Sequence, residues 1–365
     1  MKHPSTLADI PTPALVLGLA AMQRNIERMA EFFREGGCKL RPHFKAHKTT
    51  EIAKRQLAAG SCSGLTCATV AEAEVAATFC NDLLIANEVI GPDKVARVAD
   101  IAANGGDMKI AIDSAEGLAQ IAAAAQARGV EVGVIVDVNV GMPRCGVAPE
   151  AAAELAQRAA ETPGVRLRGL MGYEGHAVGI PERDKREHVA RGSMDRLLAA
   201  ATGLHDAGLP CEIVSAGGTG TYDITGRIEG ITEIQAGSYV LMDTAYGKLD
   251  MPFERAMWVL GTVISTPSPT LCVLDSGHKA CTEDHGNPDV EGIEGATVLF
   301  LSDEHASIIL PPDAGISIGD RMRLVPSHID PTINLHDVFY VFDGDQVVDV
   351  WPITARGYAE QRRHE

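Results

Sequence analysis

Short apolar runs rich in β-branched residues alternate, over the first two thirds of this chain, with alanine-rich stretches whose apolar residues recur every three or four positions. The first pattern is typical of buried strands and the second of amphipathic helices. Strands that alternate with helices form parallel sheets, because the chain needs a crossover helix to return to the same edge. The expected strands are Lys39–His43, Gly64–Ala68, Asp82–Asn87, Lys109–Asp113, Val132–Asn139, Leu167–Tyr173, Cys211–Gly217 and Thr232–Val240.

Eight such strands favour an α/β fold with a closed (β/α)₈ TIM barrel, and an open doubly wound sheet is the alternative. Helices are expected at Ala20–Glu35, Thr50–Ala58, Val70–Thr78, Ala115–Ala127, Pro149–Ala160 and Asp184–His205. Beyond Met251 the helical periodicity stops, and short apolar runs separated by Pro, Gly and Asp predict a small antiparallel β domain. Its expected strands are Trp258–Ser265, Thr270–Asp275, Thr297–Leu301, Arg321–Val325, Asp337–Phe342 and Gln346–Pro352.

These two patterns divide the 365 residues into two domains. We expect the barrel at residues 20–248 and the β domain at residues 1–19 plus 249–365, because the strand-like Ala14–Leu19 precedes the first barrel helix. A chain of this length can hold one large barrel and a second, smaller core.

The charge balance limits the partners of the chain. Lys plus Arg number 32 and Asp plus Glu 49, so the formal net charge is 32 − 49 = −17. This acidity disfavours nucleic acid and anionic membrane surfaces. No run approaches the ~20 apolar residues of a membrane span, and no signal peptide is recognisable, so we expect a cytoplasmic protein. The eight cysteines form no C-x-x-C pair and are expected to be free thiols.

In a barrel of this kind the chemistry lies at the carboxyl ends of the strands. The first strand ends in the basic segment Arg41-Pro42-His43-Phe44-Lys45-Ala46-His47-Lys48. A lysine that is partly desolvated and near other cations loses its proton easily and can form a Schiff base, which makes Lys45 a candidate. A solvated basic loop is the alternative for this segment.

A glycine-rich loop, Gly217-Gly218-Thr219-Gly220-Thr221, follows the seventh strand. Its glycines allow successive backbone N–H groups to point at one phosphate, and its threonines add hydroxyl donors. The end of the eighth strand offers Ser238 and Tyr239 as further donors. Phosphate sites after strands seven and eight are common in such barrels, although a glycine-rich loop alone can be an ordinary turn.

The fifth and sixth strands also end in polar residues. Arg144 lies in a loop with glycines on both sides and could contact a phenolate or a carboxylate. Tyr173 offers a flat ring and a hydroxyl, and His176 offers a group that titrates near neutral pH. A single histidine is more often structural, but several strand ends here supply polar groups together.

A histidine and an aspartate in the β domain suggest a metal site. If His328 and Asp330 lie on a strand, their side chains face the same side, because alternate residues of a strand do so. One nitrogen ligand and one oxygen ligand suit Mn²⁺, Mg²⁺ or Zn²⁺. A plain His–Asp hydrogen bond at a strand end is the alternative.

Together these segments resemble the family of D-threonine aldolases and eukaryotic-type D-serine dehydratases, which are alanine-racemase-like enzymes of fold type III. The resemblance runs from about Thr12 to Trp351, and it is carried by residues 41–48, 173–176, 217–222 and 326–352. It implies a barrel with a β domain, usually as a homodimer, and pyridoxal 5′-phosphate as the cofactor.

The resemblance also implies roles for individual residues. Lys45 would carry the cofactor as a Schiff base, and Arg144 and Tyr173 would contact its ring. His328 and Asp330 would bind a divalent metal beside it. The phosphate would be held by Gly217, Gly218, Thr219, Gly220, Thr221, Gly237, Ser238 and Tyr239.

Two positions bear on the reaction. The dehydratases of this family tend to carry His-x-Cys at the metal and the aldolases His-x-Asp, so His328-Ile329-Asp330 looks aldolase-like and favours Mn²⁺ or Mg²⁺ over Zn²⁺. Some of the aldolases place a histidine base where this chain has Gly179, and His176 is the candidate replacement. The expected activity is that of a lyase, which cleaves a D-β-hydroxy-α-amino acid to glycine and an aldehyde.

Other functions are kept as alternatives. A dehydratase acting on D-serine or 3-hydroxy-D-aspartate would use Lys45 as the base for the α-proton. A non-catalytic carrier of pyridoxal phosphate is disfavoured, because the barrels of that kind lack a β domain. A racemase is disfavoured because it would need no metal.

Overall fold

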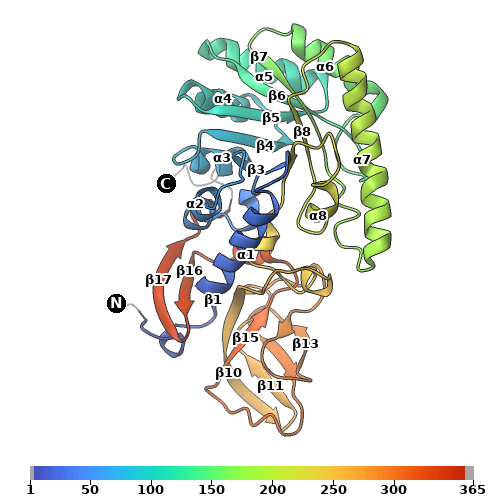
Figure 1. Ribbon diagram of the computed structural model, residues 1–365. Coiled ribbons are helices and arrows are strands. Elements are labelled where there is room, and N and C mark those ends of the chain that lie inside the picture. Colours follow the sequence, from blue (N-terminus) through green and yellow to red (C-terminus); the bar gives the residue numbers. More distant parts are fainter. Residues whose placement is uncertain (1–3, 358–365) are drawn as a thin grey trace. The chain divides into compact units, whose positions relative to one another are not determined.

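The computed structural model describes residues 4–357, and these form two compact units (Figure 1). The barrel unit comprises Met29–Lys45 and Ile52–Gly237. The β unit comprises the residues up to Arg28, Ala46–Glu51 and the residues from Ser238 onward. The expected boundaries differ from these units. The expectation placed the start of the first helix and residues 238–248 in the barrel, whereas the structure places them in the β unit. The expected domain ends at residues 1–3 and 358–365 lie outside the described range.

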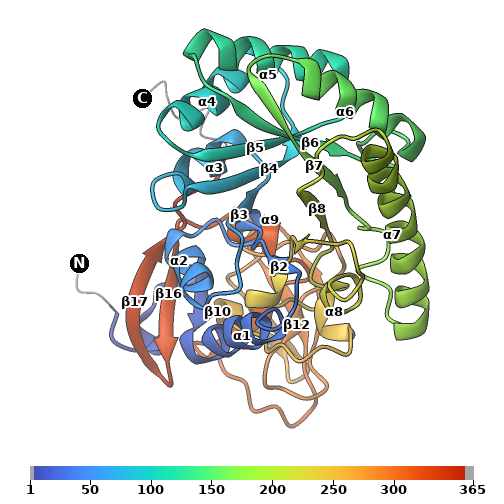
Figure 2. The same ribbon diagram turned by 45° about the horizontal axis from the view of Figure 1, so that its top comes forward.

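The barrel unit is built on eight parallel strands (Figure 2). They are β2 (Lys39–Leu40), β3 (Leu65–Cys67), β4 (Asp82–Glu88), β5 (Asp107–Ile112), β6 (Val132–Asp137), β7 (Val165–Gly172), β8 (Ile213–Ala216) and β9 (Glu233–Ile234). The sheet order is β2-β9-β8-β7-β6-β5-β4-β3, with β2 and β3 at its edges. Parallel bridges from Leu40 to Cys62 and from His43 to Thr66 join these edges. The sheet therefore closes, which confirms the expected barrel and excludes the open sheet.

Helices alternate with the strands and cover their outer side. They are α1 (Leu19–Phe32), α2 (Thr50–Ala58), α3 (Val70–Ala76), α4 (Pro92–Ala103), α5 (Ala115–Arg128), α6 (Ala152–Glu161), α7 (Arg183–Asp206) and α8 (Tyr222–Thr225), with 3₁₀ turns η2 (Phe44–Ala46) and η3 (Pro149–Ala151). Because β6 is covered on both faces, all of its residues are buried. One apolar side chain from each of β4 to β8 joins a common core cluster: Leu84, Ala111, Ile135, Met171 and Ile213.

A buried ionic network ties the amino-terminal ends of the barrel strands together. The fully buried Arg41 donates to Glu233 at 2.8 Å and to Asp82 at 2.6 Å. Lys109, also fully buried, lies 2.8 Å from both Asp82 and Asp107. The three acidic residues are the first residues of β9, β4 and β5. Arg41 of the basic segment is therefore a structural residue, because its charge is used inside the barrel.

The β unit holds a sheet of nine strands in the order β11-β14-β13-β12-β15-β10-β1-β16-β17. They are β1 (Ala14–Gly18), β10 (Met257–Ser268), β11 (Leu271–Leu274), β12 (Asp289–Val290), β13 (Thr297–Leu301), β14 (Ala306–Ile309), β15 (Arg321–Val325), β16 (Val338–Asp343) and β17 (Gln346–Pro352). As expected, the N-terminal strand joins this domain. It is antiparallel to β10 and parallel to β16.

The β unit also contains short helices, namely α9 (Ile329–Ile333) and the 3₁₀ turns η1 (Leu7–Asp9), η4 (Ser238–Val240) and η5 (Tyr246–Lys248). Its core packs Trp258 and Phe342, with ring centroids 5.7 Å apart, against Val16 and Leu260.

All eight cysteines are free thiols, as the sequence predicts. Among residues 4–357, no helix combines the length and the apolarity that a membrane crossing requires.

Candidate active site

Lys45 lies in the turn η2, directly after β2, and its side chain is half-buried. The backbone N–H of His43 donates to the carbonyl of Ala236 at 3.1 Å, so the segment after β2 runs beside the segment after β9. The N–H of Gln235 donates to the carbonyl of Ala216 at 3.0 Å, which places the segment after β8 next to them. Lys45, Gly237 and the glycine-rich loop therefore share one end of the barrel, as the sequence predicts.

Glu174 anchors the glycine-rich loop, a role that sequence reasoning missed. Its side chain is fully buried directly after β7. One carboxylate oxygen accepts the backbone N–H of Gly217 at 3.0 Å, and the other accepts the hydroxyls of Thr221 and Thr225 at 2.7 and 2.6 Å. Hydrogen bonds to a charged group are the strong ones, so the shape of the loop is fixed by this carboxylate.

Some of the predicted phosphate donors are thus engaged within the protein. The single hydroxyl proton of Thr221 goes to Glu174, as does the N–H of Gly217. In the part of the chain that the structure describes, the N–H groups of Gly220 and Gly237 donate to no protein acceptor. These two amides are the better candidates for phosphate donors, while Gly217 and Thr221 shape the loop.

The loop requires glycine at particular positions. A Cβ on Gly220 would collide with the carbonyl oxygen of Val178, at less than 2 Å. A Cβ on Gly218 would lie 3.2 Å from the ring of Tyr173. Glycine is required here because Val178 and Tyr173 occupy the adjacent space. The Gly217–Thr221 loop and Gly237, whose backbone includes the two N–H groups without a protein acceptor among the described residues, form the candidate phosphate cradle. The observation supports the fit of a phosphate-bearing cofactor.

Arg144 and Tyr173 lie together, as expected. The guanidinium carbon of Arg144 lies 5.4 Å from the centroid of the Tyr173 ring, which is a cation–π arrangement. Arg144 is exposed and Tyr173 half-buried, so both can reach a ligand. Because Tyr173 also adjoins Gly218, the aromatic ring, the cation and the phosphate cradle form one surface.

His176 is exposed and lies near the loop that carries Arg144. Its Nε2 is 3.4 Å from the hydroxyl oxygen of Ser193, and its ring would touch a Cβ added to Gly141. A Cβ on Gly179 would meet nothing within 4 Å. The space around Gly179 is therefore open, and His176 is the histidine that this chain offers near Tyr173.

A cluster of acidic groups at the ends of β4, β5 and β6 was not expected. Ligand atoms of Glu88, Asp113 and Cys145 lie within 4.8 Å of one another, and Asp137 interacts with Glu88. Burial and the repulsion from Glu88 raise the pKa of Asp137 well above its usual range. Burial likewise raises the pKa of the Cys145 thiol to about 11. Burial and the neighbouring carboxylate therefore favour the neutral form of Asp137.

Asp137→Asn should stabilise the protein increasingly as the pH rises above about 4, the ordinary carboxyl pKa. A folded-state pKa above the unfolded value means that stability from this group is complete at low pH and is lost as the pH rises. The amide mimics the protonated acid, so the difference in unfolding free energy should reach the order of 1–3 kcal/mol near pH 8.

Urea unfolding of both proteins across pH 4–9 measures this difference. Asp206→Asn is the control, because that side chain is 75% exposed. A difference that does not depend on pH would contradict the assignment.

His328 and Asp330 do meet, but not in the way the sequence suggested. Strand β15 ends at Val325, His328 precedes α9 with extended backbone, and Asp330 lies in the first turn of that helix. The expectation of a shared strand face is therefore wrong. The helical turn nevertheless brings the two side chains together, with His328 Nε2 3.5 Å from Asp330 Oδ2.

Further acidic groups surround His328, and sequence reasoning missed them. Asp284 Oδ2 lies 2.6 Å from His328 Nδ1, and the fully buried Asp243 accepts the backbone N–H of Ile329. Burial raises the pKa of Asp243 to about 6. Burial opposes protonation of His328, but hydrogen bonds and attraction from Asp330 and Asp284 outweigh it and raise the pKa of His328 to about 9.

The donor set around His328 fits a divalent cation. An imidazole nitrogen and a carboxylate oxygen face each other, and further carboxylates add negative charge nearby. Imidazole and carboxylate ligands together suit Mn²⁺, Mg²⁺ and Zn²⁺.

Ser238 and Tyr239, which were predicted as phosphate donors, also belong to the β unit. Tyr239 is fully buried, and its ring centroid lies 5.6 Å from that of Phe253. Their proposed phosphate contacts stay predictions.

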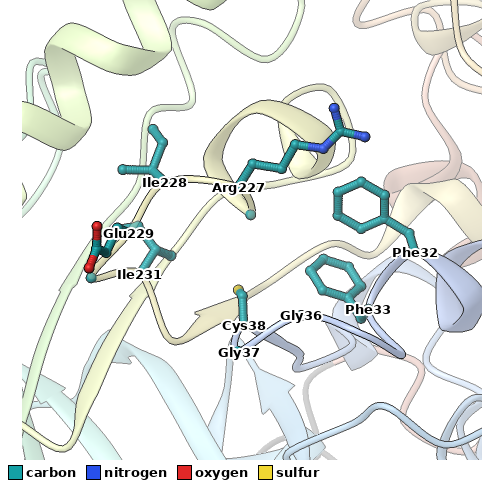
Figure 3. A pocket seen from close by; sticks show the side chains of 11 residues that line it. Phe32, Phe33, Gly36, Gly37, Cys38, Arg227, Ile228, Glu229 and Ile231 are labelled. Atoms are coloured by element: carbon teal, nitrogen blue, oxygen red, sulfur yellow. The ribbon is translucent and has the colours of Figure 1, made fainter.

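The barrel unit also contains a cavity of about 510 Å³ (Figure 3). Figure 3 shows the rings of Phe32 and Phe33 on one side and Ile228 and Ile231 on the other. These residues precede β2 and β9, whereas Lys45 follows β2. The cavity therefore lies at the amino-terminal ends of the strands, and the candidate site lies at their carboxyl ends.

Comparison with known families covers both units. The family described as "Alanine racemase, N-terminal domain" matches residues 17–245, and that described as "Putative serine dehydratase domain" matches residues 256–342. These two matches divide the chain between a barrel region and a β region.

Individual relatives match over nearly the whole chain. A D-threonine aldolase of an Arthrobacter species is 39% identical, over 97% of this chain and 94% of its own. A 3-hydroxy-D-aspartate aldolase of Paracoccus denitrificans is 35% identical, over 96% of this chain and 93% of its own. The crystal structure of D-threonine aldolase from Filomicrobium marinum superposes with a TM-score of 0.94 at 36% identity, covering 98% of this chain and 99% of that one.

Proposed function

Because the chain belongs to the alanine-racemase-like family that includes the D-threonine aldolases, we propose that it is a lyase that cleaves a D-configured β-hydroxy-α-amino acid to glycine and an aldehyde. The observation that carries the proposal is the pairing of His328 with Asp330 in a chain that also presents Lys45 beside a phosphate cradle. A racemase would need the lysine and the cradle but no cation.

The residues of the barrel unit would bind pyridoxal 5′-phosphate. Lys45 would bind it covalently through its amine, which lies half-buried directly after β2. The Gly217–Thr221 loop, held by Glu174, would receive the phosphate. Arg144 and Tyr173 would orient the ring, because their cation–π pair adjoins the loop at Gly218.

The residues of the β unit would hold the cation through His328 Nε2 and Asp330, with His176 of the barrel unit as the candidate base for the β-hydroxyl proton. When bound, the cofactor supplies an electron sink for the charge left by Cα–Cβ cleavage, and the cation acidifies the substrate hydroxyl. Since two protein ligands leave positions open, the substrate oxygen could reach the cation directly.

Finer properties follow from the same resemblance. We propose Mn²⁺ as the native cation, with Mg²⁺ or Zn²⁺ as alternatives, and a cytoplasmic homodimer as the native form. Elemental analysis of the purified protein tests the identity of the cation. Light scattering after size exclusion tests the oligomeric state.

A dehydratase is the second candidate. The same Lys45 amine could remove the α-proton of D-serine or 3-hydroxy-D-aspartate, and the hydroxyl would leave as water to give an enamine. Hydrolysis of the corresponding imine by water would then give a keto acid and ammonia. The histidine–aspartate pair, rather than histidine–cysteine, is the observation that places the aldolase first.

One experiment separates the two. The purified protein is incubated with Mn²⁺ and a panel of D-β-hydroxy amino acids, with the L-enantiomers as controls. Release of glycine and an aldehyde supports the aldolase, whereas release of ammonia and a keto acid supports the dehydratase. Cleavage of neither class would overturn both.

Gly218→Asp should weaken cofactor affinity at least about tenfold, which corresponds to 1.4 kcal/mol. A carboxylate at this position repels phosphate, and its Cβ would press on the Tyr173 ring. Titration of apoprotein with pyridoxal phosphate measures the change. Gly179→Asp is the matched control, because a side chain there enters open space. Equal affinities in the two variants would place the phosphate elsewhere.

A further inference from the structure

The His328 imidazole lies between two carboxylates, one at each ring nitrogen. Nδ1 is 2.6 Å from Asp284 Oδ2, and Nε2 is 3.5 Å from Asp330 Oδ2. These separations correspond to different kinds of contact. The difference shows which nitrogen is available to a cation.

A separation of 2.6 Å is that of a short hydrogen bond between a histidine N–H and a carboxylate. It is too short for two ligands of one cation. Bonds of about 2.1 Å at octahedral or tetrahedral angles place neighbouring ligand atoms roughly 3.0–3.4 Å apart. The 3.5 Å between Nε2 and Asp330 is close to that range, so this side of the ring is the ligand side.

We propose that Asp284 is a positioning residue for the cation site. By accepting the Nδ1–H of His328, it keeps a proton on that nitrogen, so that a cation would take the place of the proton at Nε2, the nitrogen that faces Asp330. The inference deepens the proposed function and rests on it in one respect, which is the presence of a cation at His328 and Asp330. Asp284 itself contacts neither the cation nor the substrate in this scheme.

His285 contributes to the same arrangement. Its ring stacks on that of His328 with centroids 4.3 Å apart and an interplanar angle of 8°. The stack restrains rotation of His328 about its side-chain bonds. Together, the hydrogen bond and the stack hold the imidazole in one orientation before any cation arrives.

A different arrangement uses the same residues. Ligand atoms of Asp284, His285 and His328 lie within 4.8 Å of one another, so these three could themselves bind a cation through Nδ1. The short Nδ1–Asp284 contact disfavours this, because a cation between the two atoms would have to separate them. Single substitutions distinguish the two arrangements.

The test is titration of the full-length protein with Mn²⁺, with free Mn²⁺ measured by electron paramagnetic resonance in the absence of substrate. Asp284→Ala should weaken Mn²⁺ binding about 10- to 100-fold, which is the usual effect of losing an outer carboxylate. For Asp284→Asn we expect a Mn²⁺ affinity between those of the native protein and Asp284→Ala, because the amide oxygen can still accept the Nδ1–H of His328. The absorbance of the lysine-bound cofactor should stay unchanged in each variant.

Glu283→Ala is the matched control. Glu283 adjoins Asp284 in the chain, and its side chain is 39% exposed against 44% for Asp284. Its carboxylate faces His278, at 3.6 Å, instead of His328. The control removes the same charge from the same segment, so it should leave the Mn²⁺ dissociation constant essentially unchanged.

Several results would overturn the inference. Unchanged Mn²⁺ affinity in Asp284→Ala would remove the positioning role. An equally large loss in His285→Ala would favour the three-residue arrangement, and absence of Mn²⁺ binding in the native protein would remove the cation itself. Because the titration contains no substrate, a failure of the aldolase proposal alone would leave these measurements valid.

Discussion

Replacing Lys45 with alanine is expected to abolish both the yellow colour of the purified protein and its activity. A Schiff base between lysine and pyridoxal phosphate absorbs near ~420 nm, and no other side chain can replace the amine. Lys45 lies at the strand end beside the phosphate cradle, which is the position that such a bond requires. Borohydride reduction followed by peptide mapping identifies the modified residue in the native protein.

Lys48→Ala is the control for this experiment. Lys48 belongs to the same basic segment and is also half-buried, but it lies one turn further along the chain. We expect this variant to keep its colour. Label on Lys48, or on no lysine, would contradict the assignment of Lys45.

Removal of the divalent cation with EDTA should abolish activity while the absorbance remains. The predicted ligands of the cation belong to the β unit, whereas the lysine and the phosphate loop belong to the barrel unit, so loss of one group does not require loss of the other. Lewis-acid assistance is worth several kcal/mol, so the rate should fall by at least on the order of a hundredfold. Addition of Mn²⁺ should restore it.

Variants of the two ligands extend the test. His328→Ala and Asp330→Ala should each mimic EDTA treatment, and Asp330→Cys should shift the metal preference toward zinc, because thiolate is the softer ligand. Asp337→Asn serves as a control, since that carboxylate pairs with Arg356. If protein shown by elemental analysis to be free of metal kept full turnover, the prediction would be wrong, and His328 and Asp330 would have only a structural role.

The fold was largely predictable because hydrophobic periodicity reports directly on burial. The strand Val132–Asp137 is buried at every position and stands out in the sequence. Strands β12 and β14 were missed, although strands as short as β2, β3 and β11 lie within expected segments. The expected strand Thr232–Val240 is paired only at Glu233–Ile234, since the chain turns into a 3₁₀ helix at Ser238.

The site was less predictable, because the identity of a partner depends on tertiary pairing. Lys45 and the glycine loop could be named since strand ends are recognisable. Glu174 could not be assigned a role, because its partners lie 43 to 51 residues away. Asp284 lies 44 residues from His328, and an Asp-His pair in a loop was the one signal that could have indicated it.

The carboxylate of Glu174 has a consequence for how the protein acquires its cofactor. Because two hydrogen bonds from the loop and one from Thr225 of α8 end on this buried group, the loop holds its shape without help from a bound phosphate. An apoprotein of this kind loses little conformational entropy when it is reconstituted. Cofactor-free protein should therefore survive storage with its loop intact and regain the cofactor in a single rapid phase, without a slow refolding step.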